Sequence, residues 1–266
     1  MADQYGLFID GKWINTSDTV TNRSPSDVND VIGEYAQANA DQVSMALEAA
    51  SRAVAEWGVS PMESRYQVLM AIGNELIERS GELGELLARE EGKTRAEGVG
   101  EVYRCVQLFR CCGAEVHRKI DDRADSVRPG IEIETRREAV GVVAIISPWN
   151  FPMATAVWKI APALAFGNAV IFKPANLVPA SAWALTEIIS RQALPDGAFN
   201  LLMGGGSSVG DQIIHSDQIH AVSFTGSLPV GKQVAAATAA NLVKCQLEMG
   251  SKNALIVAAD ADLEVA

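Results

Sequence analysis

Short apolar runs alternate with helix-like stretches through the second half of the chain. Residues 140–146 form an uninterrupted apolar run, rich in β-branched side chains and closed by Ser147-Pro148, which predicts a strand buried on both faces of a parallel sheet. A helical stretch over residues 153–166 follows, and residues 169–172 form a second apolar strand. Together they predict a βαβ unit, and ligands bind such sheets at the carboxyl ends of the strands. The large or polar residues at those ends are Trp149, Asn150 and Lys173.

The same alternation continues beyond this unit. Further strands are predicted at residues 198–202, 219–224, 242–247 and 254–257. Further helices are predicted at residues 179–193, from the glycines at 204–206 to residue 215, and at 227–240. Strands and helices that alternate at this spacing predict an α/β fold with a doubly wound, Rossmann-like, mostly parallel sheet.

The first half of the chain predicts mainly helices. Asp41 is a suitable N-cap for a helix that runs to residue 57, and Ser60-Pro61 opens a second helix. Two more helices are predicted over residues 82–91 and 94–119, with an interruption at Gly92 and a loosened stretch around Gly98 and Gly100. We expect these helices to serve mostly as a scaffold.

Two hairpins are predicted beside the helices. Residues 8–14 form a short one that turns at Asp10-Gly11. Residues 121–138 are strongly charged, contain Pro129-Gly130, and then alternate between apolar and polar positions. This pattern predicts an exposed two-stranded arm.

Composition and charge narrow the classes of function. The chain has 266 residues, 48% of them apolar, so it can bury a substantial core. Its formal net charge of −11 repels nucleic acid and anionic membranes, and neither is an expected partner. No run is long enough to span a bilayer, and the first residues lack the pattern of a secretory signal. The four cysteines lack metal-ligand spacing, so we expect no metal site and a reducing, cytoplasmic setting.

Three short motifs of other protein classes are incomplete. Residues 226–232 have the spacing of a phosphate loop, but Gln233 stands where Ser or Thr would hold magnesium. Residues 206–210 match the G-x-S-x-G of serine hydrolases, but Asp217 and His220 follow too closely to come from separate strand ends. The dinucleotide fingerprint G-x-G-x-x-G is absent. A helix cap of small residues beside a ligand is the favoured interpretation of residues 206–210.

Four signatures in sequence order carry a more specific signal. They are SPWNFP at 147–152, WKIAPALAFGN at 158–168 with KPA at 173–175, FTGSLPVGK at 224–232, and LEMGSKN at 247–253. The chain thereby resembles the aldehyde dehydrogenase superfamily over essentially its whole length. The resemblance implies NAD or NADP as the cofactor and a small aldehyde as the substrate. The Ser-Lys-Asn at 251–253 is most similar to the subgroup that oxidises α-ketoglutaric (2,5-dioxopentanoate) semialdehyde.

The resemblance also implies how the chain is divided. Residues 1–120 and 139–258 would form a dinucleotide-binding domain, and residues 121–138 an arm for oligomerisation. Residues 259–266 would begin a catalytic domain, the rest of which is missing. We expect a homo-oligomer, either a dimer or a tetramer, with apolar surface exposed where the catalytic domain would pack.

Two side chains are predicted to take part in chemistry. An amide at a strand end, such as that of Asn150, can donate a hydrogen bond to an oxygen that becomes negative, and the resemblance assigns this role to it. Glu248 ends a mostly apolar strand, where partly apolar surroundings suit a carboxylate to act as a general base. The resemblance implies that it activates the water that hydrolyses a thioester. Arg104 and Arg110 either hold a substrate carboxylate or lie on the surface.

A wider set of residues is expected to bind the cofactor. Lys173 suits ribose hydroxyls or phosphate, and the resemblance assigns it to the adenosine ribose. Asn176 stands where NAD-preferring relatives often carry glutamate, and a neutral amide does not repel a 2′-phosphate, so we expect NADP to be accepted alongside NAD. Gly226-Ser227 precede a helix whose free N–H groups favour a pyrophosphate. The predicted set is Ile146, Ser147, Pro148, Trp149, Lys173, Ala175, Asn176, Gly206, Gly210, Phe224, Gly226, Ser227 and Val230.

The nucleophile that the resemblance requires is not found in the chain. The family's mechanism uses a cysteine thiolate that follows the glutamate at a distance, and no cysteine follows Glu248. Cys245 precedes it within a strand, whereas Cys105, Cys111 and Cys112 are expected to pack within a helix. We therefore expect these 266 residues to bind a dinucleotide without oxidising aldehydes. The alternative is a stand-alone dinucleotide-binding or interaction module that lacks catalysis.

Overall fold

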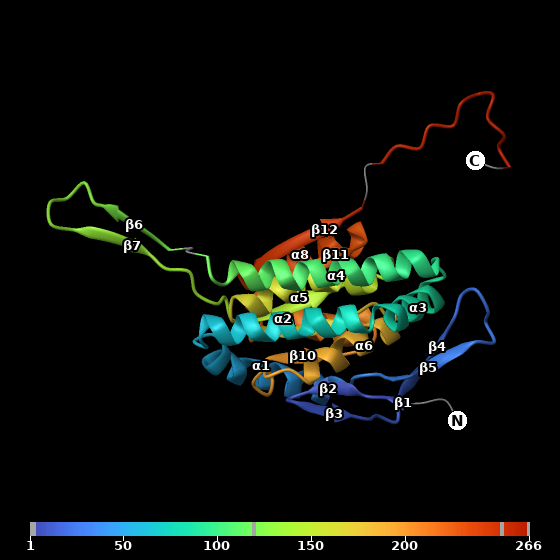
Figure 1. Cartoon of the computed structure of the whole chain (residues 1–266), viewed down its shortest axis with the longest axis horizontal. Coiled ribbons are helices and arrows are strands. Elements are labelled where there is room, and N and C mark those ends of the chain that lie inside the picture. Colours follow the sequence, from blue (N-terminus) through green and yellow to red (C-terminus); the bar gives the residue numbers. More distant parts are fainter. Residues whose placement is uncertain (1–3, 119–120, 251–252, 265–266) are drawn as a thin grey trace.

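The computed structural model describes residues 4–118, 121–250 and 253–264, and a seven-stranded sheet lies at its centre (Figure 1). The strand order is β12-β11-β8-β9-β10-β2-β3, and the first five strands run parallel. These five are β8 (Val142–Ile146), β9 (Ala169–Lys173), β10 (Phe199–Leu201), β11 (Ala221–Gly226) and β12 (Lys244–Met249). The chain passes from β8 outward to β10 and then returns to the other side of β8, so the order reverses between β8 and β11. The predicted doubly wound sheet is confirmed.

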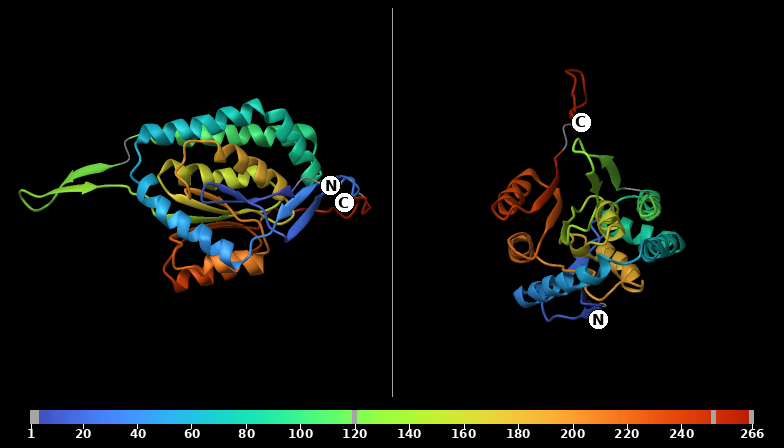
Figure 2. Two further views of the ribbon diagram at one scale, coloured as in Figure 1. Left: turned by 90° about the horizontal axis from the view of Figure 1, so that it is seen from below. Right: turned by 90° about the vertical axis from the view of Figure 1, so that its left-hand side faces the viewer.

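Helices cover both faces of this sheet (Figure 2). On one face lie α5 (Pro152–Ala165) and α6 (Pro179–Ser190), with an outer layer of α2 (Met62–Glu78), α3 (Ser80–Glu91) and α4 (Arg95–Glu115) packed over them. On the other face lie α1 (Ala40–Trp57), α7 (Asp211–Ile214) and α8 (Leu228–Ala240). Because α5 is enclosed between the sheet and the outer helices, most of its residues are buried, and it reads as apolar on nearly all sides.

The two predicted hairpins are present. β2 (Leu7–Ile9) and β3 (Lys12–Ile14) join through Asp10 and Gly11, whose φ angles of 52° and 73° give the turn that matches the twist of a hairpin. β2 pairs antiparallel with β10, which makes the main sheet mixed. β6 (Asp122–Asp125) and β7 (Glu132–Thr135) form an exposed arm that projects away from the body (Figure 1).

Several predicted boundaries differ from the structure. The N-cap of α1 is Asn39, because its side chain and that of Gln42 bond each other's backbone in a capping box, whereas Asp41 lies inside the first turn. Residues 254–257 are not a strand, since no described residue pairs with them and the segment extends as coil (Figure 1). A small sheet of β1 (Gln4–Tyr5), β5 (Val31–Ala36) and β4 (Thr19–Arg23) was not predicted.

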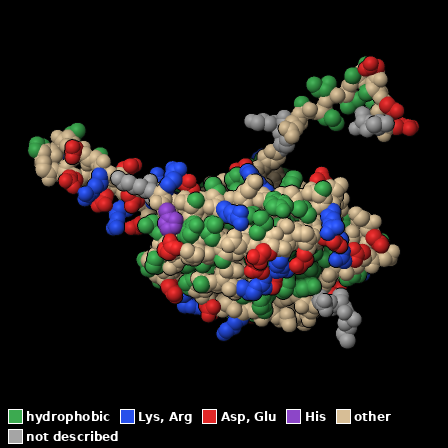
Figure 3. Space-filling model, viewed as in Figure 1, with side chains coloured by type: hydrophobic (Ala, Val, Ile, Leu, Met, Phe, Trp, Pro, Cys, Tyr) green, Lys and Arg blue, Asp and Glu red, His purple; other side chains and the backbone are tan. Residues whose placement is uncertain are grey.

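The surface of the helical layer carries mixed charge. Acidic and basic side chains are interspersed over the face that α2, α3 and α4 form (Figure 3). Arg79 connects three helices there, because its guanidinium lies 2.7 Å from both Glu82 and Glu187. None of the helices within the described residues combines the length and the apolar character that a membrane span requires.

Neither Gly98 nor Gly100 loosens α4, which corrects the prediction, and Gly98 has a packing role. α4 runs without interruption through Gly98 and Gly100, and only Gly92, with φ 80°, ends a helix. A Cβ added to Gly98 would lie 2.2 Å from the carbonyl oxygen of Gly84 on α3. The absence of a side chain at Gly98 therefore allows α3 and α4 to touch backbone to backbone.

We predict that Gly98→Ala and Gly100→Ala have opposite effects on stability. Alanine at position 98 would collide with α3 and should lower the free energy of unfolding by about 1–3 kcal/mol. Alanine at position 100 meets nothing within 4 Å and should raise it by about 0.5–1 kcal/mol through helix propensity. Urea denaturation measures both, and equal stability of the two variants would contradict the close approach.

Candidate active site

The pairing of the parallel strands brings the predicted site residues to one edge of the sheet. Ile146 on β8 is in register with both Lys173 on β9 and Phe224 on β11. Thr225 on β11 is in turn in register with Glu248 on β12. The segments that follow Ile146, Lys173 and Thr225 therefore leave the sheet side by side, together with Glu248. This edge includes the point between β8 and β11 where the strand order reverses, which is where doubly wound sheets bind ligands.

Lys173 is a buried cation with little compensation. Its residue is 5% exposed, and its ammonium donates one hydrogen bond, 2.8 Å long, to the carbonyl oxygen of Pro174. Burial lowers the pKa of Lys173 to about 8, because the charged form loses its hydration. Gly210 lies against it, since a Cβ added there would be 3.7 Å from the lysine Cδ and Cε. The ammonium has two further protons to donate to a ligand.

A second polar group without a partner lies at the neighbouring strand end. The Oγ of Ser147 is buried and forms no hydrogen bond within the described residues. The backbone N–H of Ser147 donates to the carbonyl oxygen of Lys173 at 3.3 Å, so the two residues lie next to each other. A buried hydroxyl without a partner and a buried ammonium with protons to spare fit a ligand rich in hydroxyl or phosphate oxygens.

The start of α8 offers a site for an anion. Ser227 is its N-cap and makes no capping hydrogen bond with its side chain, and both Ser227 and Val230 are exposed. The free N–H groups of such a first turn attract phosphate. Gly226 also has a packing role. A Cβ there would lie 2.6 Å from the ring of the buried Phe224, so the glycine makes room for that ring.

The remaining predicted residues line the same edge at different depths. Trp149 is 56% exposed, and Asn150 beside it is also exposed. Asn176 and Gly206 are exposed as well. The half-buried members of the set are Ile146, Pro148 and Ala175. Ser251 and Lys252 lie outside the described residues.

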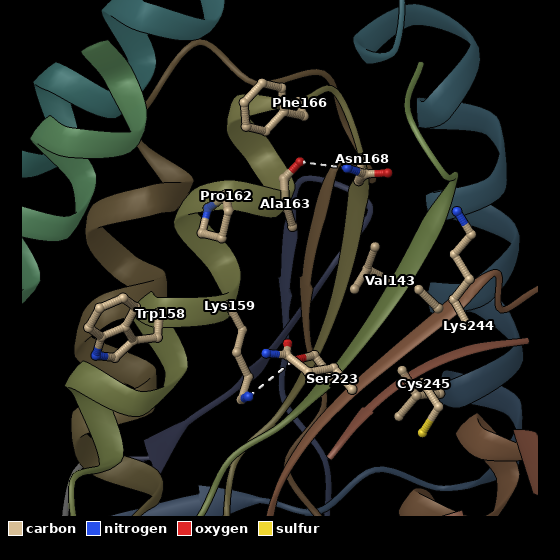
Figure 4. Close-up of a pocket in the computed structure, with 13 residues that line it drawn as sticks. Val143, Trp158, Lys159, Pro162, Ala163, Phe166, Asn168, Ser223, Lys244 and Cys245 are labelled. Carbon is tan, nitrogen blue, oxygen red and sulfur yellow. Dashed lines mark hydrogen bonds between the residues drawn. The ribbon is translucent and has the colours of Figure 1, made fainter. Parts of the chain in front are cut away.

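Glu248 is exposed, so the prediction that it lies in partly apolar surroundings is wrong for the described residues. β12 is an edge strand, and α8 packs against one of its faces while the other face is open. The open face borders a groove of about 350 Å³ between α5 and the strands β11 and β12 (Figure 4). Trp158, Lys159 and Phe166 line its helical side, and Val143, Ser223 and Gln246 belong to its sheet side.

Lys159 is a site residue that the sequence analysis missed. Its ammonium donates to the Oγ of Ser223 at 3.0 Å, and this hydroxyl donates to the Oε1 of Gln246 at 2.8 Å (Figure 4). Burial lowers the pKa of Lys159, and the negative charge of Glu248 opposes that shift. The charge of Glu248 therefore acts on a residue that lines the groove. The sequence feature that could have indicated its role is that it is a single lysine within the otherwise apolar stretch WKIAPALA.

Arg104 and Arg110 are both exposed on α4, and they have different neighbours. The guanidinium of Arg104 lies over the ring of Trp158, 5.0 Å from its centroid, beside the groove. The guanidinium of Arg110 donates to the side chain of Asn74 on α2 at 3.1 Å. Only Arg104 is therefore placed to meet a ligand in the groove.

The structure does not assemble a serine hydrolase, and two of the three thiols in α4 are held in an unreactive state. His220 precedes β11, at the opposite edge of the sheet from Ser208, and its Nδ1 accepts a hydrogen bond from the N–H of Val142. Burial raises the pKa of the Cys105 thiol well above its usual range, and raises that of Cys112 to about 11. Both therefore stay protonated near neutral pH and act as packing residues.

The fold and this polar edge define a doubly wound α/β protein with its site at the switch point of the sheet. The sequence profile of the aldehyde dehydrogenase family matches residues 13–266, and the chain belongs to this family. The resemblance carried by the four sequence signatures is confirmed.

Similar proteins include several semialdehyde dehydrogenases. The α-ketoglutaric semialdehyde dehydrogenase of Bacillus subtilis is 40% identical over 98% of this chain and 54% of its own length. The 2,5-dioxopentanoate dehydrogenase of Saccharolobus solfataricus is 38% identical over 96% of this chain and 54% of its own length. A betaine aldehyde dehydrogenase of Staphylococcus aureus, solved in complex with NAD+, superimposes with a TM-score of 0.91 and 31% identity. That match covers 94% of this chain and 50% of the solved one. The chain spans about half the length of the curated relatives it matches.

We predict that Lys173→Met stabilises the protein at neutral pH. Removal of the poorly compensated buried ammonium should raise the free energy of unfolding by about 1–3 kcal/mol. The advantage should shrink as the pH rises from about 8 to about 10.5, because the folded protein then sheds this proton while the unfolded chain retains it. Urea denaturation across this pH range measures the effect.

The matched control is Lys232→Met, which removes an exposed lysine from α8 and should leave stability nearly unchanged. A Lys173→Met variant that is less stable than the original protein at neutral pH would contradict the interpretation that the buried ammonium is poorly compensated.

Proposed function

We propose that this chain binds NAD or NADP across the carboxyl edge of its sheet, and that the protein containing it oxidises an aldehyde to a carboxylate. The observation that carries the proposal is that Asn150, Lys173 and Glu248, which are distant in sequence, share one edge. A bound nicotinamide dinucleotide supplies the hydride acceptor for such an oxidation. Family membership and the solved relative that holds NAD+ support the choice of cofactor.

Each part of the dinucleotide has a suitable partner at this edge. The ammonium of Lys173 and the hydroxyl of Ser147 suit the ribose next to adenine, because both are buried and have hydrogen bonds to spare. The uncapped first turn of α8 at Ser227 suits the pyrophosphate. The nicotinamide would then extend toward Trp149 and Asn150. Calorimetric titration of the 266-residue chain with NAD+ and NADP+ tests this, and the absence of binding to both would refute it.

In this assignment the chain contributes binding and two catalytic groups. The amide of Asn150 would donate a hydrogen bond to the aldehyde oxygen as it becomes negative. The carboxylate of Glu248, near the carboxyl end of β12, would accept a proton from the hydrolytic water. The thiol that attacks the aldehyde would come from elsewhere in the whole protein, because the thiols of Cys105 and Cys112 are held protonated. We therefore expect no aldehyde oxidation by the 266 residues alone.

For the substrate we propose a semialdehyde with a carboxylate at its far end, such as α-ketoglutaric semialdehyde. Arg104 supports this choice, because its cation is held over Trp158 beside the groove between α5 and the sheet. Two relatives whose names refer to this compound support it as well. The reported relatives are all dehydrogenases, which gives no support to the alternative of a stand-alone module without catalysis.

We also propose a division into units and an assembly. Residues 1–120 and 139–258 would form the dinucleotide-binding domain, residues 121–138 the oligomerisation arm, and residues 259–266 the start of a catalytic domain. The arm carries exposed Val127, Ile131 and Ile133, which would be covered in a homo-oligomer. A reducing, cytoplasmic setting suits the four free cysteines.

We predict that Asn176→Glu changes the choice between cofactors. Asn176 is exposed in the loop between β9 and α6, close to Lys173 in sequence. A carboxylate there should weaken NADP+ binding by at least about tenfold through repulsion of the 2′-phosphate, and should leave NAD+ binding equal or tighter. Calorimetry with both cofactors measures the change. Asn176→Gln, which keeps the amide, is the control, and strict rejection of NADP+ by the original chain would refute the dual preference.

We predict that Arg104→Met selectively impairs oxidation of the semialdehyde. In the protein extended to the length of its relatives, kcat/KM for α-ketoglutaric semialdehyde should fall by about 10- to 100-fold, because a charge-assisted hydrogen bond is lost. The value for pentanal, which has no carboxylate, should change little. Arg110→Met is the matched control and should leave both substrates unaffected, whereas equal losses for both substrates would argue against carboxylate recognition.

A further inference from the structure

Two of the three longer helices that begin at the site have N-termini bonded to buried carboxylates that lie outside it. α5 follows the loop that carries Asn150, and α6 follows the loop that carries Asn176. Each starts with a proline, which has no N–H to donate, and neither receives a capping bond from its own N-cap side chain. The groups that satisfy both helices come from a short stretch of the outer helical layer, residues 90–101.

The side chain of Glu101 on α4 caps the N-terminus of α5. Its Oε1 accepts hydrogen bonds from the N–H groups of Met153, at 3.0 Å, and Ala154, at 2.9 Å. These are the first two N–H groups of the helix, because Pro152 has none. The side chain of Glu101 is fully buried, so the interaction is shielded from water. The position of the helix start, and of the loop before it, is thereby tied to α4.

Lys93 extends this contact to the residue after Asn150. Its ammonium lies 2.5 Å from the Oε2 of Glu101 and 2.7 Å from the Oε1 of Glu91, a second carboxylate with a nearly buried side chain. The same ammonium lies 4.6 Å from the centroid of the Phe151 ring. Glu101 thus holds α5 directly, and through Lys93 it also holds the aromatic ring adjacent to Asn150.

Glu90 does for α6 what Glu101 does for α5. Its Oε1 accepts from the N–H of Ala180 at 2.6 Å, and its Oε2 accepts from the N–H of Ser181 at 2.9 Å. The amide of Asn22 donates to Glu90 at 2.9 Å and also to the carbonyl oxygen of Leu177 at 3.2 Å, within the loop that holds Asn176. Glu90 is 3% exposed.

We propose that Glu101 and Glu90 are positioning residues of the site, with Glu101 fixing the Asn150 loop and Glu90 fixing the Asn176 loop. Neither is placed to contact a ligand, since both are buried between helices. Each acts by accepting hydrogen bonds from the first backbone N–H groups of the helix that follows its loop. A charge on the surface could not do this. Their significance for cofactor binding and catalysis rests on the proposed function, whereas the tethering itself does not.

Hydrogen exchange of the 266-residue chain, followed by mass spectrometry, tests the tethering. Glu101→Ala should speed exchange at residues 153–155 by about tenfold, the value of one lost cap, and leave residues 180–182 unchanged. Glu90→Ala should do the reverse. The conservative variants Glu101→Gln and Glu90→Gln keep an acceptor oxygen and should give smaller effects at the same two places. They also provide the measurement if an alanine variant does not fold.

Glu85→Gln is the matched control, because it removes one carboxylate from α3 that is exposed and 3.8 Å from Arg95. It should leave exchange at both helix starts as in the original chain. Faster exchange throughout the protein in the Glu101 and Glu90 variants would reduce both residues to general stabilisers and overturn the proposal. Unchanged exchange at both helix starts would overturn it as well.

Binding measurements then connect the tethering to the site. Glu90→Gln should weaken binding of both NAD+ and ADP-ribose by several-fold, since both carry the adenosine end. Glu101→Gln should weaken NAD+ and leave ADP-ribose unchanged, since it acts on the Asn150 loop. Equal effects of the two variants on both probes would overturn the division of roles. If the original chain binds neither probe, the proposed function fails, and the exchange pattern still decides the tethering.

Discussion

The structure depends on five parallel strands whose carboxyl ends all face the same way. Backbone pairing in register between β8, β9, β11 and β12 places residues separated by up to 78 positions in the chain beside one another. The reversal of strand order between β8 and β11 then sends the connections that follow β8 and β11 to opposite faces of the sheet. No side-chain contact between Asn150, Lys173 and Glu248 is required for them to meet, because the strand order alone brings them together.

The strength of each local pattern explains how far the sequence predicted this arrangement. The strands around Ile145 and Ile171 were predicted because a strand buried on both faces is a nearly pure apolar run. The strand at residues 19–23 was missed because it is short and mostly polar. It is extended because it pairs with β5, not because of an apolar pattern of its own. The apolar run at 254–257 gave the opposite error, since it has no partner. Asp41 and Asn39 have similar propensities for the N-cap position. Asn39 is the N-cap because the side chain of Gln42 bonds its backbone N–H.

The site itself was predicted at the strand ends and missed elsewhere. Asn150, Lys173 and Gly226 stand at boundaries between an apolar run and a turn, which a local pattern reveals. Lys159, Glu90 and Glu101 lie within helices, and their roles depend on partners 52 to 91 residues away. The exposure of Glu248 also escaped prediction, because the burial of an edge strand depends on what covers it. Contacts of this range cannot be predicted from the periodicity of one helix.

The positive ends of the three helices that begin at this edge have two different kinds of partner. At α5 and α6 a buried carboxylate of the chain itself occupies the place that an anion would otherwise take, while the start of α8 is left open.

The unsatisfied ammonium of Lys173 has a consequence for the life of the protein in a cell. A ligand that satisfies it binds only the folded form and therefore adds to stability by mass action, in proportion to the logarithm of its concentration. With a dinucleotide as that ligand, newly made chains would mature most completely when the nucleotide pool is full. Proteolysis would then clear preferentially those copies that remain empty.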